Sequence, residues 1–220
     1  MRIITIGGLP AAGKTYTSRL VAEKNNYLAL EVEKIRWDYF NENLKENMYK
    51  YTKNIPMLEN ENMREYYLRC TLYESKIPLD VMVKWHKNTM KYIGEKLISI
   101  IEEIKLIKTE KDYIEFCKKN EKLMNYIPKF EKLNNEIIIC SHAFINTIIF
   151  FENERTRIDF QSDMNILIER FKQRENITEN KFDKNIKIYY KSYEDVLKDS
   201  VSNILDTNSK NVIEEINNLI

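Results

Sequence analysis

The chain has 220 residues, and its 35 Lys and Arg against 34 Asp and Glu give a formal net charge of +1. Hydrophobic residues make up 43% of the chain and aromatic residues 11%, which is enough to bury a core and excludes disorder as the main state. A net charge this close to zero excludes binding to nucleic acid through the overall charge of the protein. A local basic groove remains an alternative.

No segment predicts a membrane span or a secretion signal. The longest uncharged run, residues 137–151, is shorter than the roughly 20 apolar residues that cross a bilayer. The opening MRIITIGG has no signal-peptide pattern, and the widely spaced Cys70, Cys117 and Cys140 are expected to be free thiols. We therefore expect a cytoplasmic protein that does not associate with membranes.

The first forty residues predict a strand, a turn, a helix and a second strand. Residues 2–6 form a β-branched run that ends at two glycines, which is typical of a buried strand. Residues 14–24 have a helical pattern, and residues 27–32 predict the next strand. The long segment 38–132 places apolar residues at helical spacing and gives no strand signal, so it predicts several helices. These helices should break near the prolines Pro56, Pro78 and Pro128.

The rest of the chain alternates strands and helices. Strands are predicted at 136–140, 156–160 and 201–205, and helices across 163–198, in one or two pieces, and across 209–220. This alternation predicts an α/β fold, a three-layer sandwich around a parallel sheet of about five strands. Residues 1–37 and 133–220 would form the core, and the helical insert 38–132 would form a separate lobe.

The segment Gly8 to Thr15 matches the pattern G-x-x-x-x-G-K-[ST] between a predicted strand and a predicted helix. Glycines let successive backbone N–H groups turn inward, and a helix N-terminus adds partial positive charge, so the segment predicts a cradle for phosphates. Lys14 should reach the β- and γ-phosphates of ATP, and the Thr15 hydroxyl should bind Mg²⁺. The expected nucleotide contacts of this loop are Gly8, Ala11, Ala12, Gly13, Lys14, Thr15 and Tyr16.

Arginines are scarce, and two of them share one predicted helix face. Four of the nine arginines fall between residues 155 and 174. Arg170 and Arg174 are spaced i,i+4, so both guanidinium groups lie on one side of the helix and can clamp transferring phosphates. The alternative is a surface helix whose arginines pair with Glu169 and Glu175.

These motifs resemble the P-loop kinase superfamily, both its polynucleotide-kinase and zeta-toxin-like members and its thymidylate and deoxynucleoside kinases. The opening GGLPAAGKT is similar to G-L-P-G-S-G-K-[ST], with Ala11-Ala12 in place of Gly-Ser. The stretch 33–36 (EKIR) stands where relatives carry D-x-x-R, which implies that Glu33 takes the proton of an acceptor hydroxyl and that Arg36 steers the acceptor.

The resemblance extends to the last third of the chain. Arg170 and Arg174 match the lid-helix pattern E-x-x-x-x-R-x-x-x-R, which implies a lid near residues 163–190. The stretch 201–208 (VSNILDTN) is similar to the last strand and base-contacting loop, which implies that Asp206 and Asn208 lie near the adenine.

The sequence departs from the family where a third strand should end in an acidic residue that orients Mg²⁺. The run 137–140 continues into Ser141 and His142 instead. If the strand were 147–151, Glu152 would supply the acid. His142 is a candidate substrate contact at a strand end, although a lone histidine is more often structural.

The sequence therefore favours an ATP-dependent phosphotransferase whose acceptor is a small molecule, such as a nucleoside or nucleotide. The insert would bind the acceptor, and its only arginines, Arg64 and Arg69, are candidates for contacting an acceptor phosphate. Two alternatives remain: a polynucleotide 5′-hydroxyl kinase, and a nucleotide-dependent switch or assembly ATPase. The sequence does not decide between a monomer and a homodimer.

Overall fold

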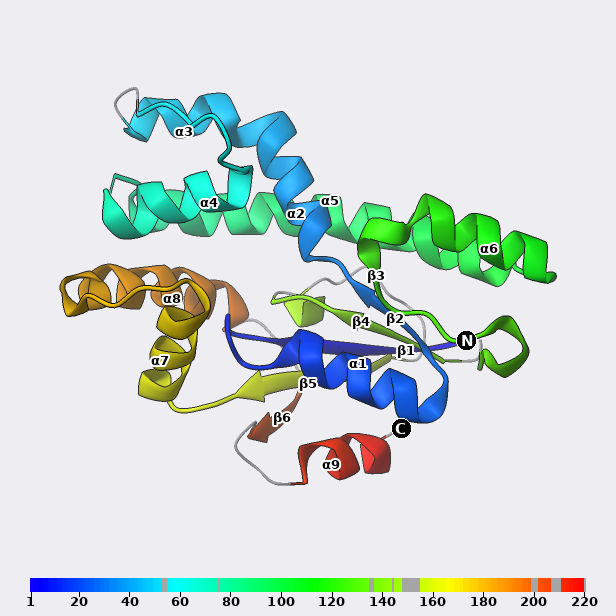
Figure 1. Ribbon diagram of the computed structural model, residues 1–220. Helices are drawn as coiled ribbons and strands as arrows, with labels where there is room; N and C mark the ends of the chain where they lie inside the picture. Colours follow the sequence, from blue (N-terminus) through cyan, green and yellow to red (C-terminus); the bar gives the residue numbers. More distant parts are fainter. Residues whose placement is uncertain are drawn as a thin grey trace.

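A six-stranded sheet forms the centre of the protein (Figure 1). The computed structural model describes residues 1–52, 55–74, 76–134, 137–143, 145–147, 155–198, 202–206 and 211–219. The strands are β1 (Arg2–Gly8), β2 (Leu28–Glu31), β3 (Met124–Tyr126), β4 (Ile137–Ser141), β5 (Arg155–Gln161) and β6 (Asn203–Asp206). Their spatial order is β3-β2-β4-β1-β5-β6, and all neighbours are parallel except β2 and β3. The predicted α/β sandwich is confirmed.

The sheet has one strand more than the predicted number of about five. β3 lies in the segment 38–132, for which no strand was expected, and it pairs antiparallel with the edge strand β2. The expectation that the segment 38–132 contains no strand is wrong at this point. Three half-buried residues, Met-Asn-Tyr, are too few to show an alternating pattern, so only their pairing with Ala29 and Leu30 identifies them as a strand.

The helices occupy the positions that the sequence indicated. They are α1 (Lys14–Asn25), α2 (Glu33–Tyr39), α3 (Lys45–Thr52), α4 (Met63–Leu68), α5 (Leu79–Lys105), α6 (Glu110–Lys119), α7 (Met164–Arg174), α8 (Asp183–Leu197) and α9 (Val212–Leu219). Two π-helical turns, Phe40–Leu44 and Arg69–Tyr73, continue α2 and α4. The expected breaks near Pro56 and Pro78 are present, and Pro78 itself precedes the first residue of α5.

Helices cover both faces of the sheet. On one face, Ile3, Leu30 and Ile138 pack against the second half of α5 and against α6. On the other face lie α1 and, beside it, α9 (Figure 1). The segment 38–132 therefore does not stand apart as a whole, because the second half of α5 is one outer layer of the sandwich.

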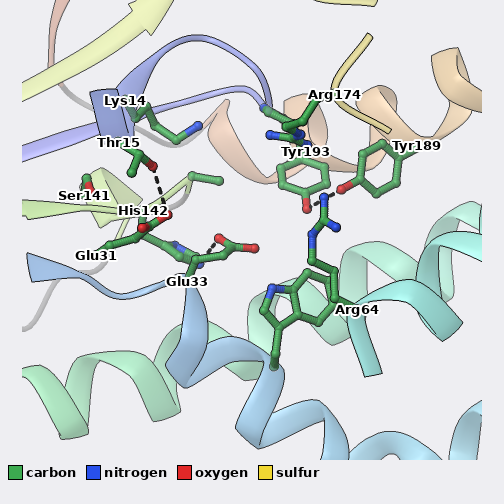
Figure 2. Close-up of a pocket in the computed structure, with 13 residues that line it drawn as sticks. Lys14, Thr15, Glu31, Glu33, Arg64, Ser141, His142, Arg174, Tyr189 and Tyr193 are labelled. Carbon is green, nitrogen blue, oxygen red and sulfur yellow. Dashed lines mark hydrogen bonds and ion pairs between the residues drawn. The ribbon is translucent and has the colours of Figure 1, made fainter. Parts of the chain in front are cut away.

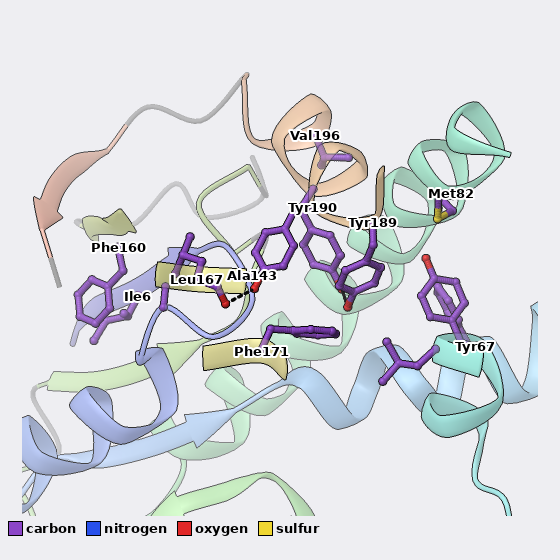
Figure 3. Close-up of a cluster of buried hydrophobic side chains, with 14 of the residues drawn as sticks. Ile6, Tyr67, Met82, Ala143, Phe160, Leu167, Phe171, Tyr189, Tyr190 and Val196 are labelled. Atoms are coloured by element: carbon purple, nitrogen blue, oxygen red, sulfur yellow. Dashed lines mark hydrogen bonds between the residues drawn. The ribbon is translucent and has the colours of Figure 1, made fainter. Parts of the chain in front are cut away.

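The first half of α5 continues beyond the sheet and packs on α8, with α2 and α4 beside it. A buried cluster joins this region to the sheet: Phe171 and Tyr189 stack at 5.4 Å between ring centroids, and Tyr67 lies 6.4 Å from Tyr189 (Figure 3). Tyr190 donates hydrogen bonds to the carbonyl oxygens of Pro10 (2.9 Å) and Leu167 (3.1 Å). α8 is thus tied directly to the loop that follows β1.

The structure also shows where aromatic residues of the insert lie and that the cysteines of the chain form no disulfide. Tyr66, Tyr67 and Trp85 are buried in the core, so they stabilise the insert and are not exposed for ligand binding. The three cysteines are free thiols, as expected. Within the described ranges, no helix has both the length and the apolar character that crossing a bilayer requires.

Candidate active site

The loop between β1 and α1 has the backbone of a phosphate cradle. Gly8 and Gly13 adopt φ angles of 116° and 84°, and Ala11 adopts 61°, all in the left-handed region. A Cβ on Gly8 would lie 2.3 Å from the carbonyl oxygen of Phe160, so no other residue fits there. No side chain caps the start of α1 at Gly13, which leaves the first-turn N–H groups for an anion.

Lys14 extends back along this loop. Its ammonium donates to the carbonyl oxygen of Leu9 at 2.7 Å. Burial lowers the pKa of Lys14 to about 8, and Arg174 lowers it further, while Glu33 opposes the change. Burial makes the charged form of Lys14 less stable. A bound phosphate would stabilise that form, because it supplies a negative charge beside the ammonium.

The cavity in front of Lys14 has a volume of about 170 Å³ and lies at the carboxyl ends of β1, β2 and β4 (Figure 2). Ligands bind at this edge of parallel α/β sheets because loops from several strands converge there. The lining residues are Pro10, Lys14, Thr15, Glu31, Glu33, Trp37, Arg64, Ser141, His142, Ala143, Arg174, Tyr189 and Tyr193.

Thr15 and Glu31 offer oxygen ligands for Mg²⁺. The Thr15 hydroxyl donates to Glu31 Oε1 at 2.9 Å. β4 ends at Ser141 without an acidic residue, and Glu31 is the register partner of Ser141 on the neighbouring strand. The alternative strand with Glu152 is not adopted at Thr147, and residues 148–154 lie outside the described part of the chain.

A hydroxyl and one carboxylate fit Mg²⁺, which keeps several waters and takes its remaining ligands from phosphates. No group of three or more His, Cys, Asp and Glu gathers among the described residues, so a cage made wholly of protein ligands is absent there. The sequence alone assigned Glu31 no role in metal binding. Its position at the last residue of β2, beside the end of β4, is the signal that would have identified it.

Glu33 is held as a carboxylate by two neighbours. Only Val32 separates β2 from α2, so Glu33 is the first residue of that helix and faces the cavity. Arg36 Nη1 donates to Glu33 Oε1 at 3.1 Å, and His142 Nε2 lies 3.1 Å from Oε2. Burial alone would raise the pKa of Glu33, but Arg36 and His142 together hold it well below its ordinary value.

Arg36 does not line the cavity, so it does not lie where it could steer an acceptor. Its side chain is 0% exposed. Its guanidinium carbon lies 4.5 Å from the centre of the Trp37 ring and 5.1 Å from that of Tyr193. Together with Phe40 and Tyr67, these rings enclose the Arg36 guanidinium, which contacts Glu33 from outside the cavity. We therefore treat Arg36 as a positioning residue.

His142 is a neutral contact of the site. Burial lowers its pKa, and the nearby Glu33 only partly opposes this. A neutral imidazole beside Glu33 leaves the carboxylate's charge for other partners. His142 lies beside Glu33, which fits a structural role, and it also lines the cavity, so its role as a substrate contact stays a prediction.

Only one of the two predicted lid arginines, Arg170 and Arg174, lines the cavity. Arg174, the last residue of α7, lines the cavity, whereas Arg170 does not. Arg174 Nε donates to Glu175 Oε1 at 2.7 Å, and its guanidinium lies 5.2 Å from the Phe171 ring. The pairing with Glu175 that was the alternative interpretation is present at Arg174, and the arginine still faces the cavity.

The insert contributes Arg64, which projects from α4 toward Arg174 and Tyr193 (Figure 2). Arg69 instead pairs with Glu61 at 2.7 Å and lies away from this cavity. Tyr189 and Tyr193 of α8 complete the wall, with a hydroxyl-to-hydroxyl distance of 2.9 Å. The sequence alone gave neither tyrosine a role.

Two further predicted nucleotide contacts, Tyr16 and Asp206, are not among the residues that line the cavity. Tyr16 is 70% exposed. Asp206 is exposed at the end of β6, and Asn208 lies outside the described residues. The assignment of an adenine site to Asp206 and Asn208 stays a prediction.

Several solved structures are similar to this chain over nearly its whole length, at low sequence identity and low TM-score. A gluconokinase from Sinorhizobium meliloti 1021 is 12% identical with a TM-score of 0.41, over 98% of this chain and 87% of that one. A shikimate kinase from Aquifex aeolicus is 13% identical with a TM-score of 0.40, over 98% and 93%. A dephospho-CoA kinase from Campylobacter jejuni is 14% identical with a TM-score of 0.41, over 99% and 97%.

No protein-family model matches the sequence, and no curated protein matches it. The three solved structures are kinases by name, but identities and TM-scores this low say nothing about a substrate. The residues that line the cavity therefore carry the functional conclusion.

Proposed function

We propose that the protein is an ATP-dependent kinase that transfers the γ-phosphate to a hydroxyl of a small molecule. The observation that carries this proposal is the convergence of Lys14, Glu33 and Arg174 on one cavity of about 170 Å³ beside the phosphate cradle. They come from three separate elements, α1, α2 and α7. A cradle alone binds nucleotide, whereas a carboxylate and a second cation facing it supply what group transfer needs.

Each of these residues has a role in the transfer. The first-turn N–H groups of α1 and Lys14 would hold the phosphates of ATP, and Arg174 would neutralise charge that builds on the moving phosphoryl group. The acceptor oxygen forms a bond to the γ-phosphorus as the bond from that phosphorus to the β,γ-bridging oxygen breaks, which releases ADP. Glu33 accepts the proton that the hydroxyl loses.

Thr15 and Glu31 would hold Mg²⁺ through oxygen atoms. The ion, when bound, neutralises phosphate charge and fixes the geometry of the triphosphate. His142 and Arg36 hold Glu33 in place during the proton transfer.

The acceptor that we favour is a nucleoside or nucleotide. Trp37, Tyr189 and Tyr193 give the cavity an aromatic wall on which a base can stack. We also propose that α2, α4 and the first half of α5 form the acceptor lobe, since Trp37 and Arg64 reach the cavity from there. Free cysteines fit a cytoplasmic enzyme.

The test measures ATP consumption and product mass with Mg²⁺ and a panel of nucleosides and nucleotides, followed by a metabolite extract. We expect acceptor-dependent formation of ADP that Lys14→Ala abolishes. Glu33→Gln should lower kcat by about 10²- to 10⁴-fold while nucleotide affinity stays near that of the wild type. Hydrolysis of ATP that no acceptor in the panel or the extract accelerates would refute the proposal.

A further inference from the structure

Two arginines that line the cavity share one carboxylate oxygen. Arg64 of α4 and Arg174 at the end of α7 both donate to Glu175 Oε1. The Glu175 side chain is only 13% exposed, whereas those of Arg64 and Arg174 are 35% and 48% exposed. A single carboxylate oxygen therefore accepts one hydrogen bond from each guanidinium group, and each group carries four further N–H donors.

Among the described residues, this bond to Glu175 uses only one of the donors of Arg64. A guanidinium carries five N–H donors in a fork that suits the two oxygens of a carboxylate or phosphate. One bond to an oxygen that Arg174 also uses is a poor match to that fork. Arg64 is also the insert's contribution to the wall that faces Glu33, the proposed base.

A second observation at the same wall points to a polar ligand. Trp37 lines the cavity, and its indole nitrogen is buried without a hydrogen-bond partner in the described part of the chain. Buried donors in folded proteins nearly always have a partner, so an unsatisfied one beside a cavity calls for an acceptor atom from a ligand or water. Trp37 and Arg64 come from α2 and α4, the elements of the proposed acceptor lobe.

We propose that Arg64 binds an anionic group of the acceptor, a phosphate or a carboxylate, and that Glu175 occupies this position while the site is empty. The acceptor is then a hydroxyl compound that also carries a negative charge. Its anion replaces Glu175 as the partner of Arg64, while Arg174 becomes available to the transferring phosphoryl group. This inference rests on the proposed kinase function and specifies its substrate.

The kinetic test compares matched acceptors that differ by one anionic group. The probes are thymidine with thymidine 5′-monophosphate and glucose with gluconate, so one pair tests phosphate and the other carboxylate. We expect at least one anionic member to be the better substrate and Arg64→Gln to raise its KM by about tenfold or more. Arg69→Gln, five residues further on, is the control, because Arg69 pairs with Glu61 away from this cavity.

A binding test separates this inference from the kinase proposal. Thermal shift and calorimetry with the same probes, in the presence of ADP and Mg²⁺, detect the anion site even if no phosphoryl transfer occurs. Binding of an anionic probe that Arg64→Gln weakens and Glu175→Gln strengthens would support the inference. Equal affinity for charged and neutral members, or weaker binding in Glu175→Gln, would overturn it, because Glu175 would then be a structural support of the arginines.

Discussion

Arg36 donates to Glu33 over 3.1 Å while its own side chain is completely buried. The same guanidinium bonds Tyr193 of α8, and its Nη2 lies 3.3 Å from Nδ1 of His86 on α5. Because arginine only donates, His86 Nδ1 is the acceptor, which leaves the imidazole hydrogen on Nε2, 3.1 Å from the Ser192 hydroxyl. Glu33 is therefore held by a chain of contacts that joins three helices.

Replacement of Arg36 should affect both stability and the pH profile. Arg36→Lys keeps a charge but cannot reach Glu33, Tyr193 and His86 together, so we expect the free energy of unfolding to fall by about 2–4 kcal/mol. Since Glu33 stays half-buried with a weaker donor, its pKa should rise, and the acid limb of kcat/KM should move to higher pH. Urea denaturation and the pH dependence of kcat/KM measure the two effects.

The exposed Lys34 on the same helix supplies the control, Lys34→Ala, for which we expect neither change. The lowered pKa of Glu33 stabilises the wild type above the ordinary carboxyl value of 4.5, and this contribution is lost as pH falls below that value. The stability difference between wild type and Arg36→Lys should therefore narrow below about pH 4.5. An unchanged acid limb in a folded Arg36→Lys enzyme would show that Arg36 does not position the base.

The hydrogen bond between Thr15 and Glu31 predicts a specific dependence on Mg²⁺. Glu31→Gln removes the charge of the carboxylate bonded to Thr15, so we expect half-maximal activity to need about tenfold more Mg²⁺. Glu23→Gln, an exposed change on α1, should leave the titration as it is. If both variants gave the wild-type Mg²⁺ curve, the metal would lie elsewhere.

Lys14 should destabilise the protein when no nucleotide is bound. Its pKa of about 8 in the folded state lies below the ordinary value of 10.5, so the unfolded chain binds more protons between these values. Lys14→Met should therefore raise the free energy of unfolding at pH 7 by roughly 1–3 kcal/mol while it abolishes nucleotide binding. Denaturation without nucleotide at pH 7 and pH 9.5 tests this.

The sign of the pH effect distinguishes burial of charge from a general packing change. Wild-type stability rises as Lys14 loses its proton above about pH 8, so the advantage of Lys14→Met should shrink toward pH 10.5. Lys24→Met, at an exposed position of the same helix, serves as the reference. An advantage of Lys14→Met that is the same at both pH values would contradict the explanation.

Local patterns were enough to predict the elements that carry the phosphate cradle. Residues 2–6 and 14–24 correspond to β1 and α1, and the region 163–198 is two helices, as one alternative had it. The break between α7 and α8 follows Asn176, which adopts a left-handed φ of 55°. Motif, helix start and strand are contiguous in the chain, so no tertiary information was needed.

Partners from distant elements could not be predicted. Arg36 follows Glu33 in a familiar spacing, but its burial depends on Tyr67 of α4 and Tyr193 of α8, which are far away in the sequence. The same holds for Glu31, whose role depends on the neighbouring strand ending in Ser141. β3 was not predicted because three residues are too few to show an alternating pattern. Its pairing with β2 depends on the tertiary structure.

Ala11 offers a test of the cradle's backbone that is independent of catalysis. It adopts a φ of 61°, in a loop where the resembling kinases carry Gly-Ser instead of Ala11-Ala12. A left-handed non-glycine residue costs about 1–2 kcal/mol, and glycine's extra freedom in the unfolded chain offsets about 0.4–1 kcal/mol of any gain. Ala11→Gly should therefore raise the free energy of unfolding by about 0.5–1 kcal/mol.

Ala12 is the matched control. It is fully buried and does not share the positive φ of its neighbour, so Ala12→Gly removes a packed methyl group and frees the unfolded chain without relieving any strain. We expect Ala12→Gly to lower the free energy of unfolding by about 1 kcal/mol. Opposite signs at two adjacent alanines, measured by urea denaturation, would locate the strain at residue 11. Destabilisation by both changes would mean that the loop does not hold Ala11 in the left-handed conformation before nucleotide binds.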